Sequence, residues 1–114
     1  KERQAFGRPI GSFQAIRHKI AMMATRTEAS RAFAYDTLRR FHEGEVVVRE
    51  VSMSKLDSQR ALVDIADEAI QIHGGYGYMR EYEVERALRD ALLGPIGGGT
   101  DEVMMEIIGK TYGL

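Results

Sequence analysis

Residues 71–78 read Gln-Ile-His-Gly-Gly-Tyr-Gly-Tyr, and their types suit close contact with another molecule. A helical pattern runs up to His73, and Gly74, Gly75 and Gly77 then interrupt it. Because glycine has no Cβ, a ligand can come directly against its backbone N–H and C=O groups. The segment therefore predicts a docking surface made of main-chain atoms at the end of a helix.

A second glycine run, Gly97 to Gly99, is followed by Thr100, Asp101 and Glu102. Threonine is a good N-cap and acidic residues suit the first helical turn, so the run predicts a helix start. The first N–H groups of a helix have no partner inside the helix and can bind a polar or anionic ligand. The two glycine segments, each at a helix end, can converge on one polar ligand.

Composition excludes several other kinds of site. The 114 residues contain no cysteine, so neither a disulfide framework nor a thiolate metal site or nucleophile is available. The three histidines, His18, His42 and His73, do not have the spacing of metal ligands, and no metal site is expected.

The charge balance also bears on partners and location. Lys and Arg number 16 against 17 Asp and Glu, for a net charge of -1, which argues against nucleic acid as a partner. The sequence has no apolar run long enough for a membrane span and no signal-peptide pattern. We expect a soluble protein of the cytoplasm, or of the mitochondrial matrix if the source is eukaryotic.

Apolar and small residues recur at intervals of three and four after Ser12, which predicts one buried face on a long helix that ends near His42. Ser12 is the expected N-cap and Gly44 the expected C-cap. Ser30 and Ala34 on this face favour close approach by a neighbouring helix. The residues of the face are Phe13, Ile16, Ile20, Met23, Thr27, Ser30, Ala34, Leu38 and Phe41.

Three further helices are expected. A second long helix starts around Val46 to Val48 and stops at Gly74. A third covers about residues 81–93, and a fourth about residues 100–110. Because the valines have no second alternating run to pair with, no sheet is expected. The chain is predicted to be one all-α domain, residues 1–114, folded as an antiparallel up-and-down helical bundle.

The start of the chain has a distinct pattern. Residues 1–6 have no initiator methionine and no capping residue, and they look like the last turn of a helix. We therefore expect a fragment whose first helix is truncated. Since a missing helix would leave an apolar seam uncovered, homo-oligomers or aggregation are expected.

Four ordered motifs carry a resemblance to a known family. They are R-x-x-F-G-x-P-I with F-Q near the start, Q-x-x-G-G-x-G-Y, E-Y-x-V-E-R with R-D-A, and I-x-G-G-T-x-E, and they span residues 3–102. This order resembles the C-terminal helical domain of the acyl-CoA dehydrogenases, flavoenzymes that oxidise acyl-CoA thioesters. The resemblance implies an oxidoreductase with FAD as cofactor and acyl-CoA as substrate.

The resemblance also implies the roles of individual residues. The matching family residues contact FAD from two subunits. Those expected to reach the FAD bound mainly by a neighbouring subunit are Arg3, Gln14, Gln71, Ile72, His73, Gly74 and Gly75. Phe6 matches a family position that packs on the cofactor. Thr100 and Glu102 are expected to contact the FAD of their own subunit. Arg86, Arg89 and Asp90 resemble ion pairs that tie the third helix to its surroundings.

Gly98 departs from the pattern of many family members. The family stretch often reads Tyr-Glu-Gly-Thr, and its glutamate takes the α-proton of the thioester while the β-hydrogen leaves as hydride to the flavin. Glycine cannot accept a proton, so no catalytic residue is assigned here. The resemblance to the isovaleryl and long-chain branch implies a base on a helix upstream of Lys1. Gly98 is then expected to bind substrate, its N–H hydrogen-bonding the thioester carbonyl.

Alternatives remain open. The parent protein can have lost dehydrogenase activity, or it can be an acyl-CoA oxidase or flavin monooxygenase on the same scaffold. A reading of another class is a non-catalytic helix-bundle module that only oligomerises. Under the dehydrogenase reading, the expected partners are the missing N-terminal and middle domains, further copies in a homodimer or homotetramer, and an acceptor such as an electron-transfer flavoprotein. The chain alone is expected to be inactive.

Overall fold

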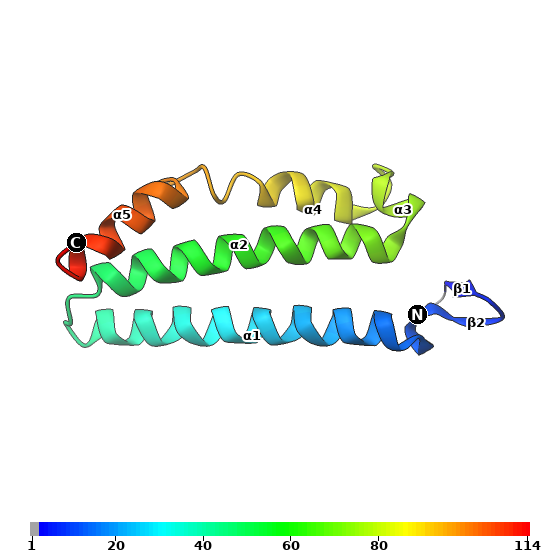
Figure 1. Ribbon diagram of the computed structural model, residues 1–114, viewed down its shortest axis with the longest axis horizontal. Helices are drawn as coiled ribbons and strands as arrows, with labels where there is room; N and C mark the ends of the chain where they lie inside the picture. The colour runs from blue at the N-terminus through cyan, green and yellow to red at the C-terminus, as the bar shows by residue number, and fades with distance from the viewer. Residues whose placement is uncertain (1–2) are drawn as a thin grey trace.

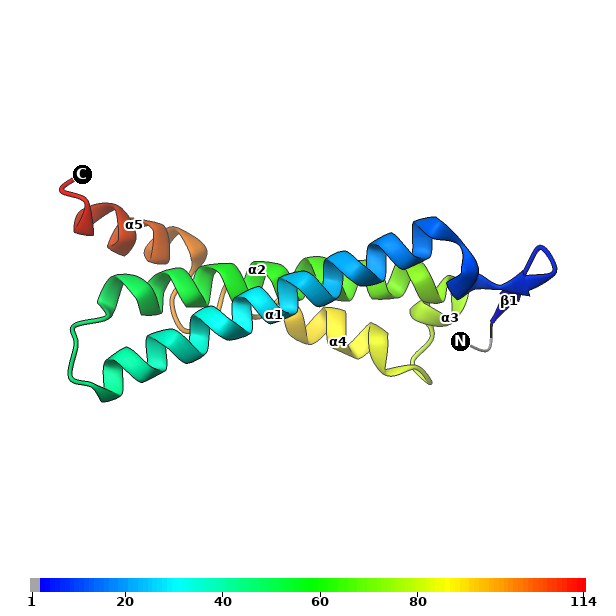
Figure 2. The same ribbon diagram turned by 90° about the horizontal axis from the view of Figure 1, so that it is seen from below.

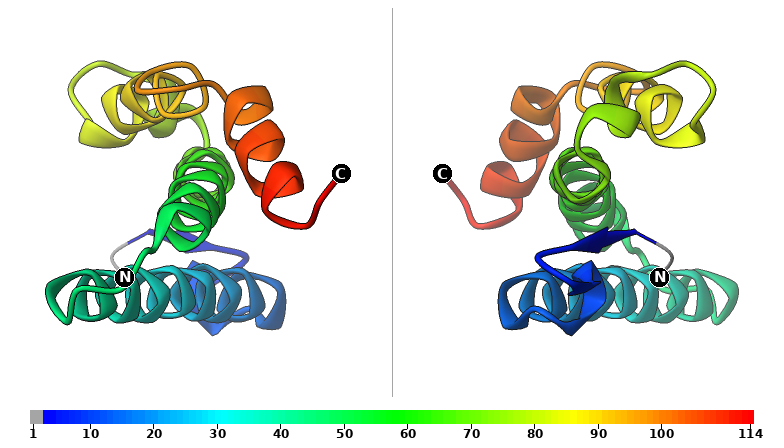
Figure 3. Two further views of the ribbon diagram at one scale, coloured as in Figure 1. Left: turned by 90° about the vertical axis from the view of Figure 1, so that its left-hand side faces the viewer. Right: turned by 90° about the vertical axis from the view of Figure 1, so that its right-hand side faces the viewer.

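The computed structural model describes residues 3–114 and is mainly helical, as predicted (Figure 1). Two long antiparallel helices, α1 (Gln14–His42) and α2 (Val48–His73), are followed by α3 (Gly75–Tyr78), α4 (Glu83–Ala91) and α5 (Asp101–Thr111). Helix α2 lies between α1 on one side and α4 with α5 on the other (Figure 3). The chain therefore runs up, down and up again, with α4 and α5 sharing the last passage.

The N-terminal segment is a short hairpin, so the predicted helix end is wrong for residues 4–6. Strand β1 (Gln4–Ala5) pairs antiparallel with β2 (Arg8–Pro9), and Phe6 and Gly7 between them have φ of 52° and 76°. Positive φ at both residues of a two-residue hairpin turn lets its twist match that of the two strands. Lys1 and Glu2 of the predicted turn lie outside the described residues. The hairpin projects from the same end of the molecule as α3 (Figures 1 and 2).

The start of α1 differs in detail from the prediction. The 3-10 helix η1 (Ile10–Ser12) precedes it, and the Ser12 hydroxyl donates to the Pro9 carbonyl at 2.7 Å instead of capping α1. Helix α1 begins at Gln14 after Phe13, whose side chain offers no capping oxygen. Gly44, with φ 86°, follows the last turn of α1 as predicted.

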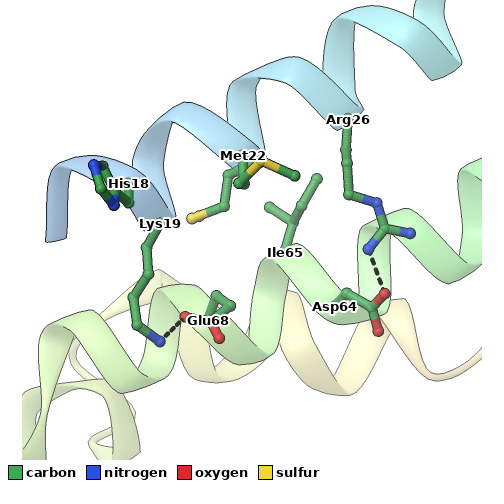
Figure 4. A pocket seen from close by; sticks show the side chains of 8 residues that line it. His18, Lys19, Met22, Arg26, Asp64, Ile65 and Glu68 are labelled. Atoms are coloured by element: carbon green, nitrogen blue, oxygen red, sulfur yellow. Dashed lines mark hydrogen bonds and ion pairs between the residues drawn. The ribbon is translucent and has the colours of Figure 1, made fainter. Parts of the chain in front are cut away.

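The contact between α1 and α2 follows a spacing of three and four residues. The α1 residues that are half-buried or buried are Ile16, Lys19, Met23, Arg26, Ser30, Phe33, Thr37 and Arg40. Ion pairs Lys19–Glu68 and Arg26–Asp64 flank an apolar floor that includes Met22 and Ile65 (Figure 4). Polar and apolar contacts therefore alternate along this seam.

Five of the nine residues of the predicted buried face are exposed, which corrects the prediction. Ile20, Leu38 and Phe41 are 50%, 49% and 61% exposed. An apolar face on a helix is broad, and α2 covers only one side of it. An open groove of about 430 Å³ runs between Leu38 and Phe41 on α1 and Val51 on α2.

The other side of α2 packs through small residues. Ala61 and Ala66 on α2, Ala91 on α4 and Met104 on α5 are buried there. Small side chains let the helix axes approach closely. The third predicted helix is shorter than expected, ending at Ala91, and the short helix α3 was not predicted because its glycines weaken the helical pattern.

A buried carboxylate joins the two long helices at their turn. Glu50, only 6% exposed, lies 2.8 Å from Arg49 and 3.3 Å from Arg40. The hydrogen bond from Arg49, with one from the backbone N–H of Glu50, lowers the pKa of this carboxyl below its ordinary value.

Within residues 3–114, no helix has the length and apolarity that a bilayer crossing needs.

Candidate functional site

A groove of about 430 Å³ lies where α2 ends and α3 begins, and we call it the Gly75 groove. Its lining residues come from the N-terminal segment and from the region where α2 meets α3. They are Arg3, Ile10, Ile72, His73, Gly74, Gly75, Tyr76 and Met79. The Arg3 guanidinium lies 5.5 Å from the centre of the Tyr76 ring. The structure therefore brings the predicted residue Arg3 next to the predicted segment 72–75.

The groove exists because α2 stops sharply at Gly74. The Gly74 N–H donates to the carbonyls of Ile70 at 3.0 Å and Gln71 at 3.2 Å, and Gly74 has φ 60° and ψ −139°. This φ is readily adopted only by glycine. The ψ value differs from that of the left-handed residue in a Schellman helix end, and the chain turns directly into α3.

The glycines of this corner have different structural roles. Apart from adjoining residues and the local helix backbone, no atom in residues 3–114 lies within 4 Å of where a Cβ on Gly74 or Gly75 would be, so both faces are open. A Cβ on Gly77 would lie 2.6 Å from the Ile70 carbonyl oxygen. Gly77 therefore serves close packing of α3 on α2, and the prediction that it presents backbone to another molecule is wrong.

Of four further predicted residues, His73 lines the groove, whereas Gln14, Gln71 and Phe6 are not among its lining residues. The His73 side chain lines it, and its Nδ1 lies 2.7 Å from the Ala69 carbonyl, which fixes that nitrogen as the donor. Gln71 and Gln14 are exposed, at the last turn of α2 and the first residue of α1. Phe6 is 95% exposed at the hairpin turn, where its ring centre is 6.2 Å from that of Phe13.

The second glycine corner, residues 97–100, starts α5. Gly98 and Gly99 have φ of 63° and 97°, and the Thr100 hydroxyl accepts from the Val103 N–H at 3.4 Å, which confirms Thr100 as the N-cap. The Gly97 N–H donates to the Leu93 carbonyl at 2.7 Å. It is therefore not free to bind a ligand, contrary to the prediction. The Gly98 N–H donates to no atom of residues 3–114.

Glu102 is on the first turn of α5 and is exposed. Its pKa is lowered, first by its own backbone N–H and then by the Thr100 hydroxyl. Both hydrogen bonds are those of a capped helix start. Thr100 and Glu102 therefore already serve α5, whatever they bind in addition.

The two corners do not meet within one copy of the chain. Asp101 pairs with Arg60, whereas Gly74 bonds to Ile70 at the far end of α2 (Figure 1). Gly74 follows Arg60 by fourteen positions, which correspond to about 21 Å along a helix axis. Convergence of both corners on one small site is therefore wrong for a single copy.

Within residues 3–114, Arg86, Arg89 and Asp90 do not tie the third helix to its surroundings as predicted. Both of its ion pairs are internal to α4, and Asp90 forms none. Arg86 pairs with Glu83 at 3.9 Å and Arg89 with Glu85 at 3.7 Å, both on α4. Such exposed pairs contribute little to stability. Across the described part of the chain, no cluster of three or more metal-ligating side chains occurs.

Three residues that hold the second corner were not predicted. Lys55, Gln59 and Arg60 on α2 all contact the segment between Gly94 and Asp101. Lys55 could have been noticed, since it interrupts the apolar face of α2 between Val51 and Leu62. The sequence gives no comparable signal for the other two.

The whole chain is similar to known flavoenzymes. Residues 1–113 match the family model described as acyl-CoA dehydrogenase, C-terminal domain. An acyl-CoA dehydrogenase of Bacillus subtilis (strain 168) is 46% identical over 110 residues, which are 96% of this chain and 29% of the relative.

Two solved structures share the fold. Butyryl-CoA dehydrogenase from Megasphaera elsdenii has a TM-score of 0.97 at 35% identity, covering 100% of this chain and 30% of that one. An FAD complex of PigA has a TM-score of 0.95 at 32% identity, again over 100% of this chain and 30% of that one. The chain thus spans less than a third of the length of these proteins, and it belongs to the acyl-CoA dehydrogenase family through its C-terminal domain.

Proposed function

We propose that this chain is the C-terminal part of an FAD-dependent acyl-CoA dehydrogenase and supplies it with FAD contacts and an oligomer interface. One observation carries the proposal: Arg3 and residues 72–75, distant in sequence and assigned to the same cofactor by separate motifs, line one groove. The PigA structure, with the same fold, is an FAD complex.

The residues of the Gly75 groove fit part of FAD. The open faces of Gly74 and Gly75 leave space that a Cβ would fill, so a flat or extended group can rest on their backbone. Arg3 supplies a fixed positive charge suited to a pyrophosphate, and Tyr76 an aromatic face. When bound, FAD supplies the acceptor for the two electrons removed from the substrate.

Gly98 is the proposed substrate contact. Its N–H has no partner in residues 3–114, and a Cβ there would meet no atom of those residues within 4 Å. A thioester carbonyl that accepts from this N–H would have its developing negative charge stabilised as the α-proton leaves. The glycines at 97–99 cannot take that proton, so we propose that the base comes from a part of the enzyme preceding Lys1.

The separation of the two corners supports a shared cofactor. We propose that the Gly75 groove of one copy and Thr100 of another contact the same FAD, in a homodimer or homotetramer. The exposed apolar groove between α1 and α2 supports burial of this face in the whole enzyme. An electron-transfer flavoprotein is the proposed acceptor, from the family resemblance alone.

Anaerobic mixing of the whole purified protein with a panel of acyl-CoA thioesters tests this proposal. We expect loss of the oxidised flavin absorbance with at least one thioester, and formation of the enoyl-CoA. A folded protein that binds no flavin would support the helix-bundle module instead. Rapid reaction of the reduced flavin with oxygen would identify an oxidase or monooxygenase.

A further inference from the structure

The segment that carries Gly98 is held in place by side chains of α2. The backbone of this segment makes few hydrogen bonds. Among the carbonyls of residues 97–99 and the N–H groups of residues 98 and 99, only the Gly99 carbonyl has a partner inside residues 3–114. Its donor is the Lys55 ammonium, which also donates to the Gly94 carbonyl at 2.8 Å. One cation therefore joins the start and the end of the segment.

We propose that Lys55 is a positioning residue for the Gly98 N–H, and through it for the substrate carbonyl. Gly98 and Gly99 have positive φ and many accessible conformations, so without a tether the Gly98 N–H has no fixed direction. A charged donor on the Gly99 carbonyl limits how far the backbone around Gly98 can rotate, since hydrogen bonds to charged groups are stronger than neutral ones. The catalytic consequence rests on the proposed function, whereas the tether itself does not.

Neighbouring contacts support the role of this face of α2. Gln59, one turn after Lys55, packs so closely on Gly94 that a Cβ there would lie 2.0 Å from its Oε1 and 3.0 Å from its Cβ. Arg60 pairs with Asp101, whose side chain is 3% exposed. Both residues hold the flanks of the segment, and within residues 3–114 Lys55 is the one donor to the Gly99 carbonyl.

The direct test compares Lys55→Met and Lys55→Arg with the control Lys110→Met, which removes a surface ammonium from α5. Amide hydrogen exchange by NMR follows the Asp101 N–H, which donates to the Pro95 carbonyl at 3.1 Å across the segment. The Gly74 N–H reports on the other corner. We expect about tenfold faster exchange at Asp101 in Lys55→Met, a smaller change in Lys55→Arg, and none in the control.

Equal acceleration at Gly74 and Asp101 would overturn the proposal, because Lys55 would then support the whole bundle. Unchanged exchange at Asp101 would overturn it as well. In the whole enzyme, we expect Lys55→Met to lower kcat about tenfold or more with KM changed by less than about threefold, and Lys55→Arg to recover part of the loss. An equal loss in both variants, or a rise in KM alone, would count against positioning.

The two arms separate the proposals. If the wild-type whole protein turns over no acyl-CoA, the proposed function fails, and the exchange result still decides whether Lys55 tethers the segment. If turnover is present and insensitive to Lys55→Met, the positioning role fails and the enzyme assignment stands.

Discussion

The two glycine corners are built in opposite ways. The first, residues 74–77, is held by its own backbone: α3 packs Gly77 on the end of α2, and Gly74 bonds to the last turn of α2. The second, residues 97–100, is held by charged side chains from the middle of α2, Lys55 and Arg60. Each corner nevertheless leaves glycine open to the outside: Gly74 and Gly75 at the first, and Gly98 at the second.

This difference separates glycines that pack from glycines that present backbone. Residue type alone does not distinguish Gly77 from Gly75, or Gly94 from Gly98. The distinction comes from the non-adjoining atoms near the Cβ position of each glycine, which are close at Gly77 and Gly94 and absent within 4 Å at Gly75 and Gly98. Substitutions at the first corner should therefore act through backbone clashes, and substitutions around the second through lost side-chain partners. Three predictions test this contrast and a fourth concerns the buried carboxylate Glu50, in order from the largest expected effect to the smallest.

Gly77→Ala should destabilise the chain by about 1–3 kcal/mol, because its Cβ would meet the Ile70 carbonyl and the backbone must shift. Gly75→Ala is the matched control and should change stability by less than about 0.5 kcal/mol. Urea unfolding followed by circular dichroism measures both. Equal losses in the two variants would contradict the assignment of packing to Gly77 and openness to Gly75.

Arg60→Met should cost about 1–2 kcal/mol, because the Asp101 carboxylate stays buried without its cation. Arg26→Met removes a pair whose side chains are 39% and 58% exposed, and should cost less than about 1 kcal/mol. The same unfolding measurement compares them. A smaller loss for Arg60→Met than for Arg26→Met would show that the second corner does not depend on its charged partners.

Thr100→Ala should cost about 0.5–1 kcal/mol through loss of the cap on the Val103 N–H. Ser12→Ala is the comparison, since Ser12 bonds to Pro9 and does not cap α1. Chemical denaturation with amide exchange in the first turn of α5 distinguishes a local from a global loss. If amide protection in α5 is unchanged in Thr100→Ala, the acidic first turn is enough to stabilise the start of this helix without the cap.

The pH dependence at Glu50 is the smallest expected effect and lies away from both corners. Its folded-state pKa is below the ordinary value of 4.5. Its contribution is therefore complete above about pH 4.5 and is lost as the pH falls through the folded pKa. Glu50→Gln should lower stability at neutral pH and flatten the decline on acidification, measured as unfolding midpoints from pH 7 to 3.

Glu81→Gln, at an exposed carboxylate with no ion pair inside residues 3–114, provides the baseline. If its pH profile changes as much as that of Glu50→Gln, the buried cluster is not the source of the acid sensitivity.

Helix positions were predictable because periodicity and punctuation agree in this chain. Gly44, Gly74 and the Thr100 cap set boundaries that the structure confirms. The hairpin at residues 4–9 was missed because positive φ at Phe6, a bulky residue, depends on its surroundings rather than on its type.

Motifs name candidate site residues, but they do not show which of these residues lie together in space. Arg3 and Gly75 were named from motifs, and the groove they share appears only in three dimensions. Lys55 and Arg60 act on a segment about forty residues later, so local patterns carry no sign of their partners. The separation of the corners likewise depends on where α5 docks along α2.

The central claim is that one FAD joins the Gly75 groove of one copy to the Thr100 corner of another. In the whole protein, Gly75→Val and Thr100→Val should each reduce bound FAD. Co-purified mixed oligomers, with a different tag on each variant, test the claim most directly: a shared site predicts that about half of the FAD sites are intact and regain FAD. Mixed oligomers that bind no more FAD than either variant alone would contradict it.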